Sequence, residues 1–156
     1  MQPLQLSAHV SLAEFIRSDT SIAKGINNDL PPEYLPRAIA TAAMIEKIRA
    51  ALGNRPILIS SGYRCEALNR AVGGQVNSDH LRGDASDITA PNFGEPYNVA
   101  KALEPLVNDL EIGQLILEGV GGKRWVHVST HRPSLPINRI LTITHAGAVP
   151  GIHPVV

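Results

Sequence analysis

The sequence predicts an α+β fold in which a small, mainly antiparallel sheet is covered by helices. Helical periodicity dominates the first third of the chain, and short strand patterns dominate its second half. The 156 residues are 44% hydrophobic and 18% charged, which suffices for one domain with a real core but not for two. We therefore expect a single domain over residues 1–156.

Three parts of this domain differ in their patterns. Residues 1–54 are expected to form a helical N-terminal part, and residues 55–144 to form the sheet and the core that carries any site. The tail at 145–156 is apolar yet broken by glycine and proline, so it is expected to pack as an irregular strap.

The expected helices are predicted from apolar periodicity and from capping residues. Ser11 and Glu14 have capping-box spacing ahead of a short helix. Apolar residues recur at spacings of three and four over residues 35–52, which predicts one long helix. Shorter helices are expected at 65–72 and at 98–110, the latter capped by Asn98 and kinked or divided at Pro105.

Strand patterns occupy five short segments. The run PILIS indicates a buried strand, and the next segments alternate apolar and polar residues. The glycine-rich GVGGK joins two of them as a hairpin. The expected strands are 56–60, 85–89, 114–118, 124–129 and 139–144.

Composition limits the classes of partner. Lys+Arg and Asp+Glu balance at 14 each, so no global field favours nucleic acid or an anionic membrane. The single cysteine, Cys65, excludes an internal disulfide. No run approaches the roughly 18 apolar residues of a membrane span, and the N-terminus lacks the pattern of a signal peptide. These features predict a protein made in the cytoplasm, without membrane insertion.

Three side chains form a candidate metal site: His80, Asp87 and His127. Alternation in WVHVS places His127 and Trp125 on the face opposite the core valines, and Asp87 likewise faces away from the core. His80 precedes Asp87 by seven residues across a glycine-containing turn. Two imidazoles and a carboxylate suit Zn²⁺ with a fourth coordination position open to water. Spacing alone is a weak signal, because such pairs arise by chance and an exposed histidine is usually solvated.

Four motifs in order strengthen the metal hypothesis. Together they resemble the zinc D-Ala-D-Ala peptidase family, M15, which includes D,D-carboxypeptidases, D-Ala-D-Ala dipeptidases and the L-alanyl-D-glutamate endopeptidases of phage lysins. The resemblance runs from about residue 60 to residue 129 and implies one Zn²⁺ ion, in a cleft on the sheet, held by His80, Asp87 and His127. The motifs are SGYR (61–64), LNRAVGG (68–74), SDHLRGDASD (78–87) and WVHVS (125–129).

The resemblance also implies roles for neighbouring residues. Arg64 matches the family arginine that holds the substrate or polarises the scissile carbonyl, and Ser78 matches a serine that hydrogen-bonds near the substrate. A surface ion pair is the alternative for Arg64, and a turn or cap residue is the alternative for Ser78. Trp125 lies two residues before His127 and is therefore expected on the same face of the strand. It is either a core residue or a wall of the substrate site.

One position departs from the family pattern. Many members carry the general base, Glu or Asp, three positions before the last histidine, where this chain has Arg124. An arginine cannot accept a proton from water. Glu118 is the best substitute if it pairs with Trp125 across the hairpin, because it then faces the site diagonally to His127; otherwise it is an ordinary hairpin acid. Asp84 is a weaker substitute and is expected in solvent.

These observations predict a zinc metallopeptidase acting on peptidoglycan stem peptides, as a D,D-carboxypeptidase or an endopeptidase. Without a signal peptide, it reaches the wall as a phage or prophage lysin released through a holin, or carried on a virion; a cytoplasmic dipeptidase needs no export. The competing interpretation is a catalytically impaired zinc domain that binds a wall peptide or serves as a virion structural part.

Overall fold

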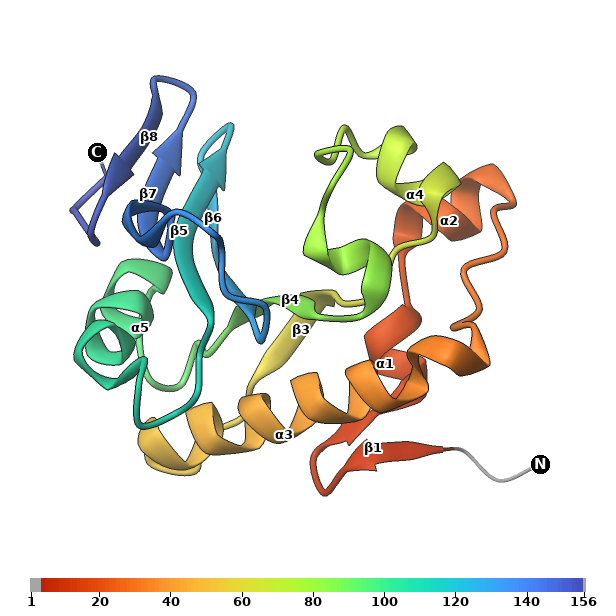
Figure 1. Ribbon diagram of the computed structural model, residues 1–156, viewed down its shortest axis with the longest axis horizontal. Helices are drawn as coiled ribbons and strands as arrows, with labels where there is room; N and C mark the ends of the chain where they lie inside the picture. The colour runs from red at the N-terminus through yellow and green to blue at the C-terminus, as the bar shows by residue number, and fades with distance from the viewer. Residues whose placement is uncertain (1–3, 156) are drawn as a thin grey trace.

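A six-stranded sheet organises the second half of the chain, and the computed structural model describes residues 4–155 (Figure 1). The strand order is β3-β4-β6-β5-β7-β8, and only the β5–β7 pair is parallel among these neighbours. The predicted α+β fold with a mainly antiparallel sheet is therefore confirmed. The strands are β3 (Leu58–Ser61), β4 (Ala85–Thr89), β5 (Gln114–Val120), β6 (Lys123–Ser129), β7 (Ile140–Thr144) and β8 (Gly147–Pro150).

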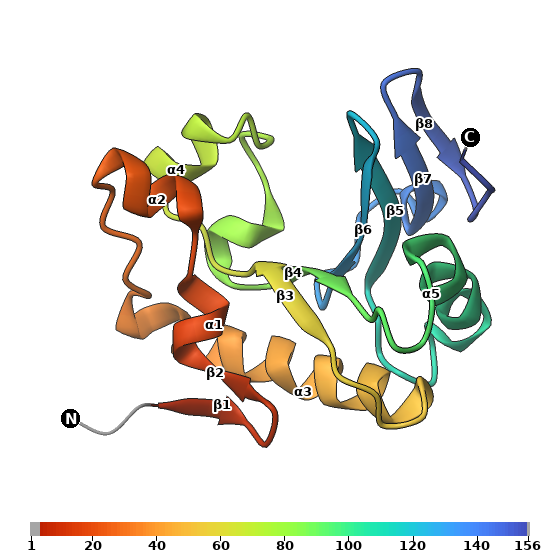
Figure 2. The ribbon, with the colours of Figure 1, turned by 180° about the vertical axis from the view of Figure 1, so that it is seen from behind.

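The helices begin and end largely where caps predict. The capping box of Ser11 and Glu14 is formed, and the long helix α3 runs along the bottom of both views, beneath α1 and β3 (Figures 1 and 2). None of the helices in residues 4–155 has the length and hydrophobicity needed to cross a bilayer. The helices are α1 (Leu12–Ile16), α2 (Asp19–Lys24), α3 (Leu35–Ala51), α4 (Glu66–Ala71) and α5 (Pro96–Leu103). Single 3-10 turns occur at η1 (Pro32–Tyr34), η2 (Asp79–Arg82), η3 (Glu104–Leu106) and η4 (Pro136–Asn138).

The core lies between the sheet and the helices α3 and α5. Val126 and Val128 of β6 are fully buried against these helices, as strand alternation predicts. A second cluster, centred on the buried Phe15, joins α1 and α3 under the N-terminal hairpin. Members of the main cluster include Met44, Ile48, Leu52, Ile88, Val99, Leu103, Leu115 and Leu117.

Several expectations about local structure were wrong. The segment 147–150 is not irregular but forms β8 on the outer edge of the sheet, where the missing N–H of Pro150 is tolerated. The N-terminal part also contains a hairpin, β1 (Gln5–Ser7) with β2 (Val10–Ser11). The strand expected to be buried at 56–60 is the opposite edge strand, β3, in which Leu58 is 53% exposed.

The helix near residue 98 begins earlier than its predicted cap. Glu95 is the N-cap and Pro96 occupies the first turn, where the fixed φ of proline suits a helix, so Asn98 is not the cap. The predicted division at Pro105 is confirmed, because α5 ends at Leu103 and a 3-10 turn follows.

The contribution of α3 to the core can be tested on two isoleucines of this one helix. Ile48 is fully buried against the sheet, whereas Ile39 is 45% exposed. Ile48→Ala is expected to lower the free energy of unfolding by about 2–5 kcal/mol, because it removes buried methyl groups and leaves a cavity. Ile39→Ala is the matched control and should cost about 1 kcal/mol or less. Urea unfolding of both variants measures the difference, and equal losses would contradict this packing.

Candidate metal centre

Three side chains from separate segments converge on one point. Asp87 of β4 and His127 of β6 are directly opposite in the antiparallel ladder, and His80 comes from the turn η2. One ligand atom of each residue lies within 4.8 Å of the other two. The two imidazole rings are 5.2 Å apart between centroids and meet edge to face. The structure thus brings together the three residues expected to bind metal, on the sheet face opposite the core valines.

A single carboxylate oxygen lies between the two histidines. Oδ1 of Asp87 is 3.3 Å from Nε2 of His80 and 3.3 Å from Nδ1 of His127. The side chain of His80 is almost wholly buried, and its Nε2 has no hydrogen-bond partner among the described residues. Buried polar atoms in this position normally have a partner. A cation between these atoms would satisfy both the ring nitrogen and the carboxylate.

The ring of His80 is held by the chain that follows β3. Nδ1 of His80 lies 2.7 Å from the carbonyl oxygen of Gly62, which can only accept, so Nδ1 carries the proton and leaves the Nε2 lone pair toward Asp87. A Cβ added at Gly62 would collide with the carbonyl oxygen of Phe15. The close approach of Gly62 to the backbone of Phe15 therefore requires glycine. The arrangement fixes the tautomer that a metal at Nε2 needs.

The electrostatics of the three groups are coupled. For Asp87, burial acts to raise the pKa, but His80 and His127 together hold it well below its usual value. Burial lowers the pKa of His80, and the charge of Asp87 only partly opposes this. Burial also acts to lower the pKa of His127, but its hydrogen bond to Asp87 and the charges of Asp87 and Glu118 raise the pKa overall. The site therefore holds an ionised carboxylate between imidazoles of unequal basicity.

Glu118 faces the metal-binding residues from the neighbouring strand. The β5–β6 register pairs Glu118 with Trp125 and Ile116 with His127, which is the register under which Glu118 was expected to face the site. Oε1 of Glu118 is 3.8 Å from Nδ1 of His127. Burial raises the pKa of Glu118, with His127 and Arg64 opposing and Asp87 reinforcing the shift. A partly buried carboxylate of raised pKa suits proton transfer near neutral pH.

Arg64 lies beside the same cluster. Its backbone N–H donates to the carbonyl oxygen of His80 at 3.0 Å, and its Nε is buried without a partner among the described residues. Burial lowers the pKa of the Arg64 guanidinium, while Asp87 and Glu118 act to raise it. None of the ion pairs within residues 4–155 involves Arg64, so the alternative of a surface ion pair is not seen there.

Ser78 makes a structural contact, whereas Trp125 lies on the same face of the sheet as His127. Ser78 is the N-cap of η2, and its hydroxyl accepts from the backbone N–H of His80 at 3.2 Å, which corresponds to the cap alternative. Trp125 has the parity of His127 on β6 and is half-buried, with Nε1 lacking a partner in the described part of the chain.

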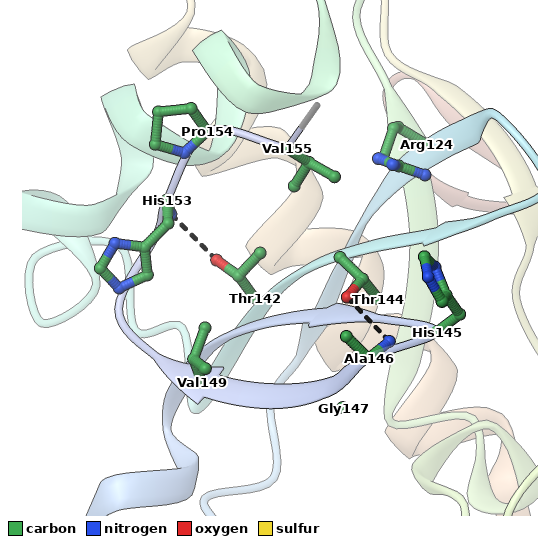
Figure 3. Close-up of a pocket in the computed structure, with 10 residues that line it drawn as sticks. All are labelled: Arg124, Thr142, Thr144, His145, Ala146, Gly147, Val149, His153, Pro154 and Val155. Atoms are coloured by element: carbon green, nitrogen blue, oxygen red, sulfur yellow. Dashed lines mark hydrogen bonds between the residues drawn. The ribbon is translucent and has the colours of Figure 1, made fainter.

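Asp84 and Arg124 both lie away from the candidate metal centre. Asp84 is not in solvent but buried, and its carboxylate pairs with Arg37 at 2.8 Å, so the expectation for it was wrong. Arg124 is an odd number of residues from His127 on a regular strand and therefore faces the opposite side of the sheet. There it lines a pocket of about 310 Å³ with Thr144 and Val155 (Figure 3).

Asp79, which lies next to His80, was not among the site residues predicted from the sequence. Its carboxylate accepts from the hydroxyl of Ser129 at 2.8 Å, and Ser129 follows His127 by two residues on β6. The pairing joins segments 50 residues apart, so no local pattern marks it.

Comparisons with known proteins point to one family. A family model described as Peptidase M15 matches residues 8–129. A zinc D-Ala-D-Ala carboxypeptidase of Streptomyces albus G is 37% identical to this chain over 57 residues, which are 36% of this chain. The matched part spans only 22% of the length of that protein.

In the metal-free protein, the two histidines should protonate at different pH values. As the pH is lowered from 8, His127 should take up its proton before His80, because Asp87 stabilises the charged ring of His127 while burial disfavours that of His80. Asp87→Asn should lower the pKa of His127, because the hydrogen bond to a charged group and the charge of Asp87 are lost, and only the charges of Glu118 and Asp79 still oppose burial. Imidazole nitrogen shifts followed by NMR measure this order, and protonation of His80 first would contradict the assigned electrostatics.

Proposed function

This chain belongs to the peptidase M15 family, and we propose that it is a zinc-dependent peptidase that hydrolyses peptidoglycan stem peptides. The observation that carries the proposal is the convergence of His80, Asp87 and His127 around one point. Two imidazoles and one carboxylate leave a fourth coordination position for water or substrate, which is typical of catalytic rather than structural zinc. The name of the matched Streptomyces carboxypeptidase supports both the metal and the D-Ala-D-Ala type of substrate.

The donor set fits one Zn²⁺ ion. Nε2 of His80 has its lone pair free and Asp87 is ionised, so two ligands are ready without loss of a proton. His127 offers Nδ1, which points toward the same carboxylate oxygen. When bound, zinc would supply a Lewis acid that acidifies water and polarises the scissile carbonyl.

The residues around the donors supply the remaining steps. Glu118 takes a proton from the attacking water and delivers it to the leaving amine, which its raised pKa and its position beside His127 favour. Arg64 stabilises the negative charge that develops on the carbonyl oxygen, since its buried guanidinium lies close to the site. Ser78 and Trp125 border the substrate in this scheme, Ser78 through the turn that carries His80.

The enzyme cleaves either the C-terminal D,D bond of the stem peptide, as a D,D-carboxypeptidase, or a bond within that peptide, as an endopeptidase. The place of action is the bacterial cell wall, reached as a phage or prophage lysin through a holin or on a virion. The alternative is a zinc domain that binds wall peptides without cleaving them, and it was favoured by Arg124 at the usual base position. The location of Glu118, 3.8 Å from His127, supports the enzyme instead.

Metal binding can be tested apart from catalysis. Protein stripped by a chelator should bind one Zn²⁺, and His80→Ala should raise the Kd by more than about 100-fold, beyond the effect of an outer-sphere change. Affinity should weaken as the pH falls through the raised pKa of His127, because protons compete for its ring nitrogen. Competition with a chromophoric chelator measures both effects. His145→Ala, at an exposed histidine, is the control and should bind as wild type.

Catalysis can be tested with the proposed base. Glu118→Gln should lower kcat/KM for hydrolysis of defined muropeptides by about 10²–10⁴-fold while leaving the zinc Kd nearly unchanged. Glu111→Gln, at an exposed carboxylate paired with Lys47, is the control and should keep full activity. Mass spectrometry of the products also identifies the bond. Turnover retained in Glu118→Gln would remove Glu118 as the base, whereas bound but intact peptide with wild-type protein would support the binding module.

A further inference from the structure

The three proposed ligands are not fixed in the same way. Asp87 and His127 lie on neighbouring strands, and the backbone ladder of β4 and β6 sets their separation. His80 lies outside the sheet, on the four-residue turn η2. A one-turn 3-10 helix has little stability of its own. The distance between the two imidazoles therefore depends on contacts that join η2 to β6.

Asp79 makes such a contact through its side chain. Its Oδ2 accepts from the hydroxyl of Ser129 at 2.8 Å, and its Oδ1 accepts from Nη2 of Arg82 at 2.6 Å. Asp79 directly precedes His80, and Ser129 lies on the same face of β6 as His127, two residues further on. Only 13% of the Asp79 side chain is exposed, and Ser129 is fully buried. The bridge is thus shielded from water, where hydrogen bonds to a charged group are strongest.

The hydrogen bonds of His80 lead to different parts of the fold. Its ring donates to Gly62, after β3, and its backbone N–H donates to Ser78 within the same turn. Neither reaches β6. The backbone N–H of Thr130, just after β6, donates to the carbonyl oxygen of Asp84. Because Asp84 lies after the end of η2, this bond extends the β4–β6 pairing and does not hold η2 itself. Asp79 therefore links the turn bearing one histidine to the strand bearing the other by a side-chain hydrogen bond.

We propose that Asp79 is a positioning residue: its carboxylate ties η2 to β6 through Ser129 and thereby sets the spacing of His80 and His127 for a single ion. The inference rests on the proposed zinc site. Asp79 itself contacts neither metal nor substrate in this scheme. Its effect is on the geometry of the ligands before the ion arrives, so that less reorganisation is required on binding.

The test compares Asp79 with a carboxylate bridge elsewhere in the same protein. Glu46 accepts from the hydroxyl of Ser7 and from the backbone N–H of His9, and so ties the N-terminal hairpin to α3. Glu46→Ala removes a similar serine–carboxylate bridge that does not involve the candidate metal centre. It reports what a loss of general stability alone does to metal binding.

Full-length variants are titrated with Zn²⁺ in the presence of a competing chelator, and with Co²⁺ while the visible spectrum is recorded. Asp79→Ala should raise the zinc Kd by about 10-fold or more and change the d–d bands of bound Co²⁺. Asp79→Asn should be closer to wild type, because an amide can still bridge Arg82 and the Ser129 hydroxyl. Glu46→Ala should lower the melting temperature of the metal-free protein yet leave the Kd and the cobalt spectrum unchanged.

Ser129→Ala keeps the experiment decisive if Asp79→Ala fails to fold. It removes the hydroxyl that donates to Asp79 and accepts from the backbone N–H of His131, and it should weaken zinc binding in the same direction. Wild-type affinity and an unaltered cobalt spectrum in the folded variants would overturn this inference alone, as would an equal loss of affinity in Glu46→Ala. Failure of the wild-type protein to bind zinc would instead overturn the proposed function on which the inference rests.

Discussion

The carboxylate oxygen of Asp87 that lies 3.3 Å from a nitrogen of each histidine is the constraint on which the site depends. Because Nδ1 of His80 is committed to the carbonyl of Gly62, its Nε2 faces this oxygen with a lone pair. Two electron-rich atoms held this close, away from water, repel each other unless a cation or a proton lies between them. The fold thus holds these atoms at a separation that a proton or a cation between them stabilises.

The hydrophobic core keeps this arrangement in register. His127 stands between Val126 and Val128 on β6, both of which are fully buried against the helices. A slip of one residue in the β4–β6 pairing would expose both valines and drive His127 into the core, at a cost of several kcal/mol for the two apolar side chains alone. The same argument applies to Glu118, which follows the buried Leu117 on β5. Packing on one face of the sheet therefore fixes the chemistry on the other.

The features of the site that could be predicted are those that depend on residues close together in the sequence. Alternation in ASDIT and WVHVS correctly placed Asp87 and His127 away from the core, because strand parity is a local property. The Glu118–Trp125 register was accessible for the same reason, since a tight hairpin fixes which residues oppose. The metal-binding roles themselves rest on the motifs and stay a proposal.

The errors arose where tertiary partners decide. The acid Asp84 was expected in solvent because small residues surround it in sequence, yet Arg37 of the distant α3 neutralises it in the interior. The exposure of β3 and the pairing of β8 depend on which strands occupy the two edges of the sheet. The sequence of one strand does not indicate which strands will pair with it. The bridge from Asp79 to Ser129 was missed for the same reason.

The contrast between Arg124 and Glu118 shows that strand parity, and not distance along the sequence, decides which residue can act as a base here. A residue three positions before His127 on a regular strand must face the opposite side of the sheet. Arg124 does so, with its side chain over Gly119, where an added Cβ would collide with it. A carboxylate at that position would also lie behind the sheet. On this backbone a carboxylate that faces His127 has to come from a neighbouring strand, and the β5–β6 register places Glu118, the proposed base, there.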